Sequence, residues 1–289
     1  MNKVCFFNHY HNGDLFHSKS FIKEIIENVD STFSYAHSNH PIVLSDLNLD
    51  YSQIPNISPY SKFVSVEDTL YVNTWIGCYF DVNKPYHGEC TLRFSYQMFG
   101  EIYDYFNNIF GSKLRLSPVK NYFPFVDYSK FDCQKIDEFV KDNTQKKILF
   151  SNGPCLSGQS HYNGDMSEII ERCASNNRDK LFIATFKFDT NLDNIKFTSD
   201  IIQSNECDLN EISYLSKYCN LIIGKNSGPF CFSTTGENVM DSNKTFYAFG
   251  ERPTDCFYYD MDIECQFIFE NTSNYEEIQN SIYQMSCEL

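Results

Sequence analysis

One short segment in the second half of the chain reads as a strand, a tight turn and the start of a helix. Between the apolar run 221–223 and the mainly apolar run 230–235 stand Lys225, Asn226, Ser227, Gly228 and Pro229. Gly224 and Gly228 would let the backbone approach a ligand, and Pro229 suits the first turn of a helix, where its missing N–H costs nothing. The N–H groups at such a helix start favour an anion, most commonly a diphosphate. A plain strand-to-helix connection is the alternative interpretation.

The composition excludes several classes of partner. The chain of 289 residues carries a net charge of −15, so the basic surface that nucleic acid or an anionic membrane requires is missing. No apolar run approaches membrane-spanning length, which predicts no transmembrane segment. The twelve cysteines are scattered singly and form no C-x-x-C pair, so we expect free thiols, no zinc ribbon and a cytoplasmic protein.

Hydrophobic periodicity predicts two α/β units, 1–125 and 126–289, because strands alternate with amphipathic helices in both halves. The connection between them is expected within the proline-punctuated and polar stretch 112–146. Ligands of such folds bind outside the carboxyl ends of the strands. The predicted extended segments are 4–9, 32–36, 42–44, 63–66, 70–73, 147–151, 181–185, 195–198, 221–223, 245–249 and 266–269.

A glycine-rich loop at 153–160 has the spacing of a Walker A motif, but Gln159 stands where that motif has lysine. Glutamine lacks the positive charge that meets the β- and γ-phosphates, so an NTP-hydrolysing P-loop is not favoured. Ser157, Gly158, Gln159 and Ser160 could still act as neutral donors toward a ligand. A turn followed by a helix N-cap explains the loop equally well.

A carboxylate follows the first predicted strand, in the order His11, Asn12, Gly13 and Asp14. At the mouth of a cleft, Asp14 could serve as a general base. It could equally cap a helix that begins near Leu15. The histidines nearby show no metal-binding pattern at helical spacing, so no metal site is predicted.

Trp75, the only tryptophan, ends a predicted strand of the first unit. Sugars often stack on aromatic rings, although a lone tryptophan more often belongs to a core. The chain has neither the G-x-G-x-x-G fingerprint of nicotinamide cofactors nor a G-x-S-x-G nucleophile elbow, which excludes two common classes of α/β enzyme.

Two of these segments together resemble the bacterial heptosyltransferase family (glycosyltransferase family nine). Its members have an N-terminal Gly-Asp-Leu/Val loop, similar to residues 13–15, and an Asp-Ser-Gly-Pro turn between a strand and a helix, similar to residues 226–229. The resemblance implies a GT-B architecture, with two Rossmann-like domains facing a central cleft. Asn226 replaces the family's Asp, Cys231 stands where His is frequent, and Gln159 occupies the region of a basic residue.

The resemblance and the residues together predict a glycosyltransferase, hexosyl- or heptosyltransferase-like, that uses a nucleotide-sugar donor and a glycan or glycolipid acceptor. We expect inversion, no metal and no other cofactor. Two alternatives remain: a non-catalytic nucleotide- or glycan-binding protein with a degenerate transferase fold, and a phosphotransferase that uses the 153–160 loop. The site residues are then Asp14 and His11 for catalysis, Asn12, Gly13 and Trp75 for the acceptor, and Ser157, Gly158, Gln159, Ser160, Lys225, Asn226, Ser227, Gly228 and Pro229 for the donor.

Overall fold

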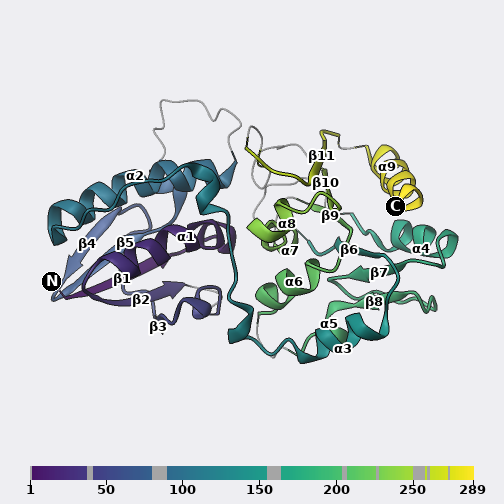
Figure 1. Ribbon diagram of the computed structural model, residues 1–289, viewed down its shortest axis with the longest axis horizontal. Coiled ribbons are helices and arrows are strands. Elements are labelled where there is room, and N and C mark those ends of the chain that lie inside the picture. Colours follow the sequence, from purple (N-terminus) through teal and green to yellow (C-terminus); the bar gives the residue numbers. More distant parts are fainter. Residues whose placement is uncertain are drawn as a thin grey trace. The chain divides into compact units, whose positions relative to one another are not determined.

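The computed structural model describes residues 2–37, 42–79, 90–154, 164–203, 207–225, 228–249, 258, 261–272 and 274–289. Contacts divide the chain into two compact units (Figure 1). Unit 1 comprises Met1–Lys130 with Tyr258–Met261, and unit 2 comprises Phe131–Phe257 with Asp262–Leu289. Each unit has its own sheet and its own helices, so the predicted class of two α/β units is confirmed.

The sheet of unit 1 has the strand order β3-β2-β1-β5-β4, and only β4 runs antiparallel to its neighbour. The central strand β1 is buried throughout its apolar part, which explains why it could be predicted as a continuous apolar run. Helices α1 (Asn12–Asn28) and α2 (Thr91–Phe110) pack against each other. The strands are β1 (Lys3–Asn8), β2 (Thr32–His37), β3 (Asp50–Ser52), β4 (Phe63–Val66) and β5 (Thr69–Asn73).

The prediction of an extended segment at 42–44 is wrong. These residues form a turn that leads into the single 3-10 turn Ser45–Leu47. The Ser45 N–H and hydroxyl both donate to the Ile42 carbonyl, so a serine side chain closes the backbone where an extended chain was expected.

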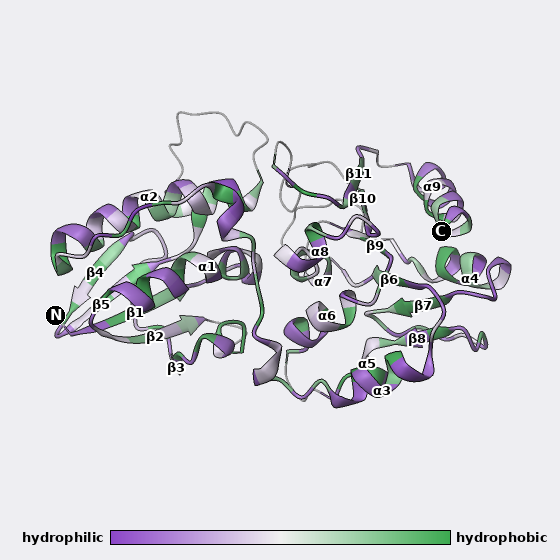
Figure 2. Ribbon diagram, viewed as in Figure 1, coloured by the Kyte–Doolittle hydropathy of each residue, from purple (hydrophilic) through white to green (hydrophobic). Residues whose placement is uncertain are grey.

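The sheet of unit 2 is entirely parallel, with the order β11-β10-β9-β6-β7-β8. Figure 2 shows that its strands are hydrophobic, whereas α4 and α9 carry one hydrophobic and one hydrophilic side. The strands are β6 (Lys147–Ser151), β7 (Leu181–Ala184), β8 (Ile195–Phe197), β9 (Leu221–Lys225), β10 (Thr245–Phe249) and β11 (Gln266–Glu270). The longer helices are α3 (Gln134–Asp142), α4 (Ser167–Asn176), α6 (Leu209–Ser216) and α9 (Tyr275–Glu288).

Helix α3 lies in the stretch that the sequence predicted as a connection. Its apolar stripe consists of Ile136, Phe139 and Val140 only, and Ile136 is the only one of them that is fully buried. The remaining residues of α3 are polar or half-buried, which is why composition alone indicated a linker.

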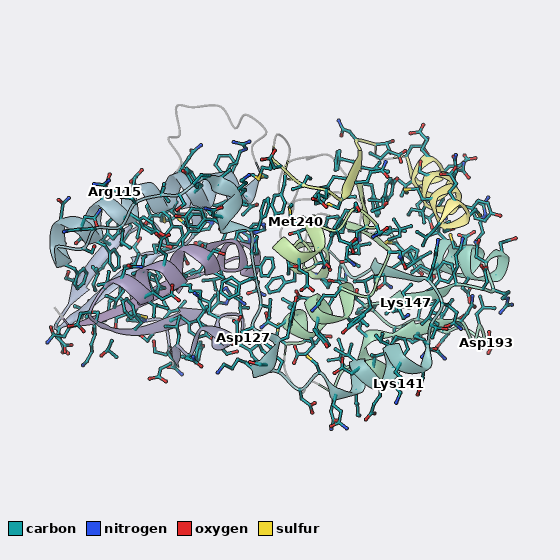
Figure 3. The ribbon with its side chains drawn as sticks, viewed as in Figure 1. Arg115, Asp127, Lys141, Lys147, Asp193 and Met240 are labelled. Carbon is teal, nitrogen blue, oxygen red and sulfur yellow. The ribbon has the colours of Figure 1, made fainter. Side chains whose placement is uncertain are left out.

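Three buried lysines stand at or just before the amino ends of the strands in unit 2; Figure 3 labels one of them, Lys147, at the start of β6. Each ammonium donates to carbonyl oxygens at the end of a helix, where backbone acceptors have no helical partner. Lys147 donates to the carbonyls of Asn143 and Gln145 after α3, Lys180 to Ser286 and Cys287 in α9, and Lys244 to Ser216, Lys217 and Cys219 after α6.

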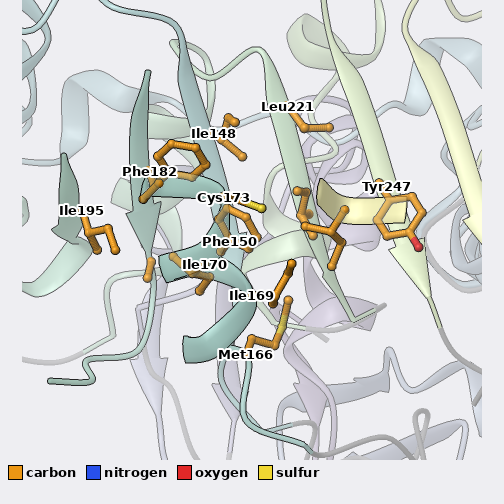
Figure 4. Packing of buried hydrophobic residues seen from close by; sticks show 14 of the residues in the cluster. Ile148, Phe150, Met166, Ile169, Ile170, Cys173, Phe182, Ile195, Leu221 and Tyr247 are labelled. Carbon is orange, nitrogen blue, oxygen red and sulfur yellow. The ribbon is translucent and has the colours of Figure 1, made fainter. Parts of the chain in front are cut away.

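One hydrophobic core of unit 2 lies between one face of the sheet and the helices α4 and α9. Figure 4 shows Ile148, Phe150 and Phe182 from the strands beside Ile169 and Cys173 from α4. All five side chains are at most 1% exposed, so this face of the sheet is closed and dry. The core therefore holds the strands rigidly and leaves their carboxyl ends to carry the loops.

Candidate active site

The order of the strands identifies where each unit can bind a ligand. In unit 1 the chain runs outward from β1 to β3 and then places β5 on the other side of β1. In unit 2 it runs outward from β6 to β8 and then places β9 on the other side of β6. Loops leave such a reversal in opposite directions, and ligands bind at the carboxyl ends of the two strands. The candidate residues of the sequence lie at the end of β9 or follow β1, β5, β6 and β9 along the chain.

A buried asparagine shapes the turn after β1. The Asn8 side chain accepts the backbone N–H of Tyr10 at 2.8 Å and that of His11 at 3.1 Å. Helix α1 then begins at Asn12, so Asn12, Gly13 and Asp14 form its first turn rather than a loop before it. His11 is the N-cap residue, and its side chain makes no capping hydrogen bond.

Asp14 is therefore not the helix cap that the alternative interpretation proposed. The N-cap position belongs to His11, and the Asp14 Oδ2 accepts the backbone N–H of Ile76 at 3.2 Å. The residue is 6% exposed and lies in the first turn of α1, where the helix dipole favours a negative charge. The structure thus holds an aspartate at the reversal of the first sheet, in contact with the loop after β5.

His17 follows one turn later in α1 and is completely buried. Its Nδ1 lies 2.9 Å from the Gly13 carbonyl oxygen, and its Nε2 lies 3.2 Å from the Tyr258 hydroxyl. Tyr258 also stacks on Phe123, with ring centroids 5.2 Å apart. No local pattern in the sequence could reveal this support of the Asp14 turn, because Tyr258 is 241 residues from His17.

Trp75 lies in the loop after β5, directly before Ile76. It is half-buried rather than part of the core, and its ring contacts two tyrosines. The ring centroid of Tyr10 lies 4.6 Å from that of Trp75, and the centroid of Tyr60 lies 5.6 Å from it. The two tyrosines were not predicted, since neither belongs to a recognisable motif.

In unit 2, Lys225 ends β9 and is only 1% exposed. Its Nζ donates to the Gly153 carbonyl oxygen at 3.3 Å, so the ends of β9 and β6 are joined at the reversal of the second sheet. Asn226 and Ser227 lie outside the described residues, as do Ser157, Gly158, Gln159 and Ser160. Whatever these six residues contribute to a donor site stays a prediction.

The two glycines of this turn have different roles. Gly228 has φ +52° and ψ −125°, a conformation open to glycine and strained for other residues. Gly224 lies inside β9, and an added Cβ would come within 2.6 Å of the Ser151 Cβ on β6. Gly224 thus permits close strand packing, and this packing accounts for the glycine; ligand approach at Gly224 stays a prediction.

The helix after the turn is shorter than expected. Pro229 occupies the first turn as predicted, but α7 (Pro229–Phe232) ends after a single turn and α8 (Gly236–Val239) follows. A helix of one turn aligns few peptide dipoles, so its macrodipole is weak. Any attraction of this turn for an anion therefore depends mainly on its N–H groups and on the nearby Lys225.

A pocket of about 280 Å³ lies at the carboxyl ends of β6, β7 and β9. Asn152 shapes it, because its side chain accepts the Phe186 N–H and donates to the Phe186 carbonyl, both at 2.8 Å. Phe186 is 60% exposed, and Lys187 next to it pairs with Asp200 at 2.5 Å. These residues were not predicted, because the loop after β7 has no motif. The lining includes Asn152, Pro154, Asp165, Phe186, Lys187 and Lys225.

Several negative findings apply to the described part of the chain. No group of three or more His, Cys, Asp or Glu side chains in it could hold a metal ion. No described helix is both long and apolar enough to span a bilayer. No disulfide bond joins any two of the ten cysteines that the structure describes.

Comparison with known proteins shows which solved structures this fold resembles. No family model and no curated protein matches the sequence. A glycosyltransferase of family 9 from Veillonella parvula DSM 2008 is similar in structure, with a TM-score of 0.55 and 11% identity over 97% of this chain and 89% of that chain. The E. coli heptosyltransferase WaaC, solved with ADP-2-deoxy-2-fluoro heptose, is also similar in structure. Its TM-score is 0.54, with 7% sequence identity over 99% of both chains. The expected resemblance is confirmed at the level of the fold: this chain has the GT-B type of α/β architecture.

Proposed function

We propose that the protein is a glycosyltransferase that moves a sugar from a nucleotide-sugar to a hydroxyl group of a glycan or glycolipid. One observation carries the proposal: each sheet presents an ionisable, nearly buried side chain at its reversal, Asp14 in unit 1 and Lys225 in unit 2. A base and a cation are the two charges that sugar transfer from a nucleoside diphosphate needs. The fold shared with nucleotide-sugar-dependent transferases supports the same reaction.

The donor is proposed to bind unit 2. Lys225, with the backbone at Gly228 and Pro229, faces the diphosphate and stabilises the charge that develops on it as it leaves. Asn226, Ser227 and the loop residues Ser157, Gly158, Gln159 and Ser160 are proposed as further donor contacts. The exposed ring of Phe186, which lines the pocket, offers a stacking surface for the base.

The reaction is proposed as a single displacement with inversion, without a metal or another cofactor. The acceptor oxygen attacks the anomeric carbon, the bond from that carbon to the diphosphate oxygen breaks, and Asp14 takes the hydroxyl proton. The leaving diphosphate keeps the electron pair, and the positive charge of Lys225 compensates the negative charge that develops on it. His11, which lies beside Tyr10 with ring centroids 6.0 Å apart, is the second candidate for the base.

The acceptor is proposed to bind unit 1. Asn12 and Gly13 belong to the same helical turn as Asp14, and Trp75 precedes the residue whose N–H contacts the Asp14 carboxylate. These positions would hold the attacking hydroxyl within reach of the base, as general base catalysis requires. We further propose that the protein works in the cytoplasm, where nucleotide-sugars and reduced thiols occur together.

The test is to incubate the protein with ADP-, UDP- and GDP-sugars and to measure release of the nucleoside diphosphate, with and without glycan acceptors. We expect release from at least one donor in the presence of a chelator. Nucleotide binding without release would support the non-catalytic alternative, which the replacement of Asp by Asn226 favours. Phosphate transfer from ATP only with Mg²⁺ would support a phosphotransferase that uses the 153–160 loop.

A further inference from the structure

Three aromatic rings gather at the carboxyl ends of β1 and β5. Tyr10 and Tyr60 flank Trp75 and are 41% and 71% exposed, which is unusual for large rings that contact one another. We define these residues as the aromatic platform. Scattered exposed aromatic residues need no explanation, but a cluster beside a candidate base does.

Two buried asparagines hold the platform in place. The Asn73 side chain accepts the Trp75 N–H at 2.9 Å and donates to the carbonyls of Pro59 and Ser61, at 2.7 and 3.1 Å. It thereby fixes the residues on either side of Tyr60. Asn8, on the neighbouring strand, accepts the Tyr10 N–H. Both asparagines are fully buried, so the rings are positioned before any ligand binds.

Gly77 provides the space for the tryptophan ring. A Cβ at this position would lie 2.4 Å from the Trp75 indole, which is too close for any real contact. The indole therefore lies directly over a glycine backbone, and its position depends on the absence of a side chain there. This dependence provides a way to move the ring without changing it.

We infer that the aromatic platform binds a neutral pyranose ring of the acceptor, with the apolar face of the sugar on the rings of Tyr10, Trp75 and Tyr60. A sugar is the ligand that needs both an apolar surface and a nearby carboxylate, because it has C–H groups on one face and hydroxyl groups at its edge. The loop that carries Trp75 donates to Asp14, so both features belong to one local structure. The net charge of −15 disfavours an acidic acceptor. That the bound sugar is the acceptor rests on the proposed function, but sugar binding itself can be measured independently of it.

Trp75 is the only tryptophan, so intrinsic tryptophan fluorescence reports on the platform alone. The probes are the methyl glycosides of glucose, galactose, mannose and N-acetylglucosamine, followed by a glycan array, each with and without a saturating nucleoside diphosphate. We expect a saturable change for at least one sugar. Tyr60→Ala and Gly77→Ala should weaken that binding by about tenfold or more, since aromatic residues at the centre of an interface dominate affinity.

Tyr60→Phe should retain binding, because the ring remains. Tyr51→Ala is the matched control, since Tyr51 is 44% exposed on β3 and is not part of the platform. The inference is overturned if no sugar binds, or if Tyr60→Ala and Gly77→Ala bind like the wild type. Sugar binding without any donor turnover would uphold the platform and reject the proposed function.

Discussion

Buried lysines lie at both ends of the second sheet, but their surroundings differ. At the amino ends, Lys147, Lys180 and Lys244 donate to the carbonyl oxygens that end helices. Burial also holds the pKa of Lys147 and of Lys244 below the ordinary value. At the carboxyl ends, Lys225 lies beside a pocket and next to the start of a helix.

The difference follows from the direction of the chain in a parallel sheet. Helices end near the amino ends of the strands, where their carbonyl groups need donors, so a lysine there completes the fold. Helices begin near the carboxyl ends, where N–H groups are already in excess. A lysine there adds its charge to the positive end of the helix dipole. Under the proposed function, a bound anion would neutralise that positive charge. The end of the sheet at which a lysine lies, rather than its burial, therefore distinguishes the proposed donor-binding lysine from the three at the amino ends.

The largest effect is expected at the carboxyl end of the first sheet. Asp14→Asn keeps the shape and the hydrogen bond to Ile76 but removes the proton acceptor, so turnover should fall by roughly 100- to 10,000-fold. Nucleoside diphosphate affinity and thermal stability should remain close to those of the wild type. Initial rates of diphosphate release, with calorimetry on the same samples, test this. Wild-type turnover in Asp14→Asn would move the role of the base to His11.

Lys244→Met should have the next largest effect, and on stability alone. Three carbonyl oxygens would lose a charged donor in a buried position, and hydrogen bonds to charged groups contribute about 1.5–3 kcal/mol each in favourable cases. Because the contributions to one ammonium are not additive, we expect a loss of about 3 kcal/mol in the free energy of unfolding, measured in urea. An unaltered midpoint would mean that the amino-end lysines do not support the fold.

Lys225→Met is the matched change at the other end of the sheet. It should weaken nucleoside diphosphate binding by roughly 10- to 150-fold, the equivalent of about 1.5–3 kcal/mol for a charge-assisted contact. Lys244→Met, refolded and measured below its unfolding transition, should bind normally. Equal losses of nucleoside diphosphate affinity in Lys225→Met and Lys244→Met would contradict the proposed difference between the two ends of the sheet.

The smallest expected effect concerns Cys219, whose carbonyl accepts from Lys244. Burial raises the pKa of its thiol from 9.0 to about 12, so the folded state keeps a proton that the unfolded chain releases above pH 9. Stability from this group is therefore present at neutral pH and lost as pH rises. Linkage gives a loss of about 1.4 kcal/mol between about pH 7 and about pH 10. The stability difference between wild type and Cys219→Ala should shrink by that amount, and a constant difference would contradict the assignment.

The sequence could predict those elements that have strong apolar runs, and the candidate residues that follow them along the chain. Strands β1 and β9 are almost wholly buried, which is why Asp14 and Lys225 could be located at their ends. The start of α1 was misplaced because the Asn8 side chain, rather than Asp14, shapes the turn. Phe186 and Tyr60 were missed because side chains of distant residues position them, and no local pattern records such contacts.

The central claim is that the carboxyl end of the second sheet binds the diphosphate of a donor. A crystal structure of the protein with ADP, UDP or GDP, chosen by calorimetry, tests it most directly. We expect phosphate oxygens within hydrogen-bonding distance of the Lys225 Nζ and of the Gly228 N–H, with the base near Phe186. Failure of all three nucleotides to bind, or a diphosphate bound away from residues 225–229, would contradict it.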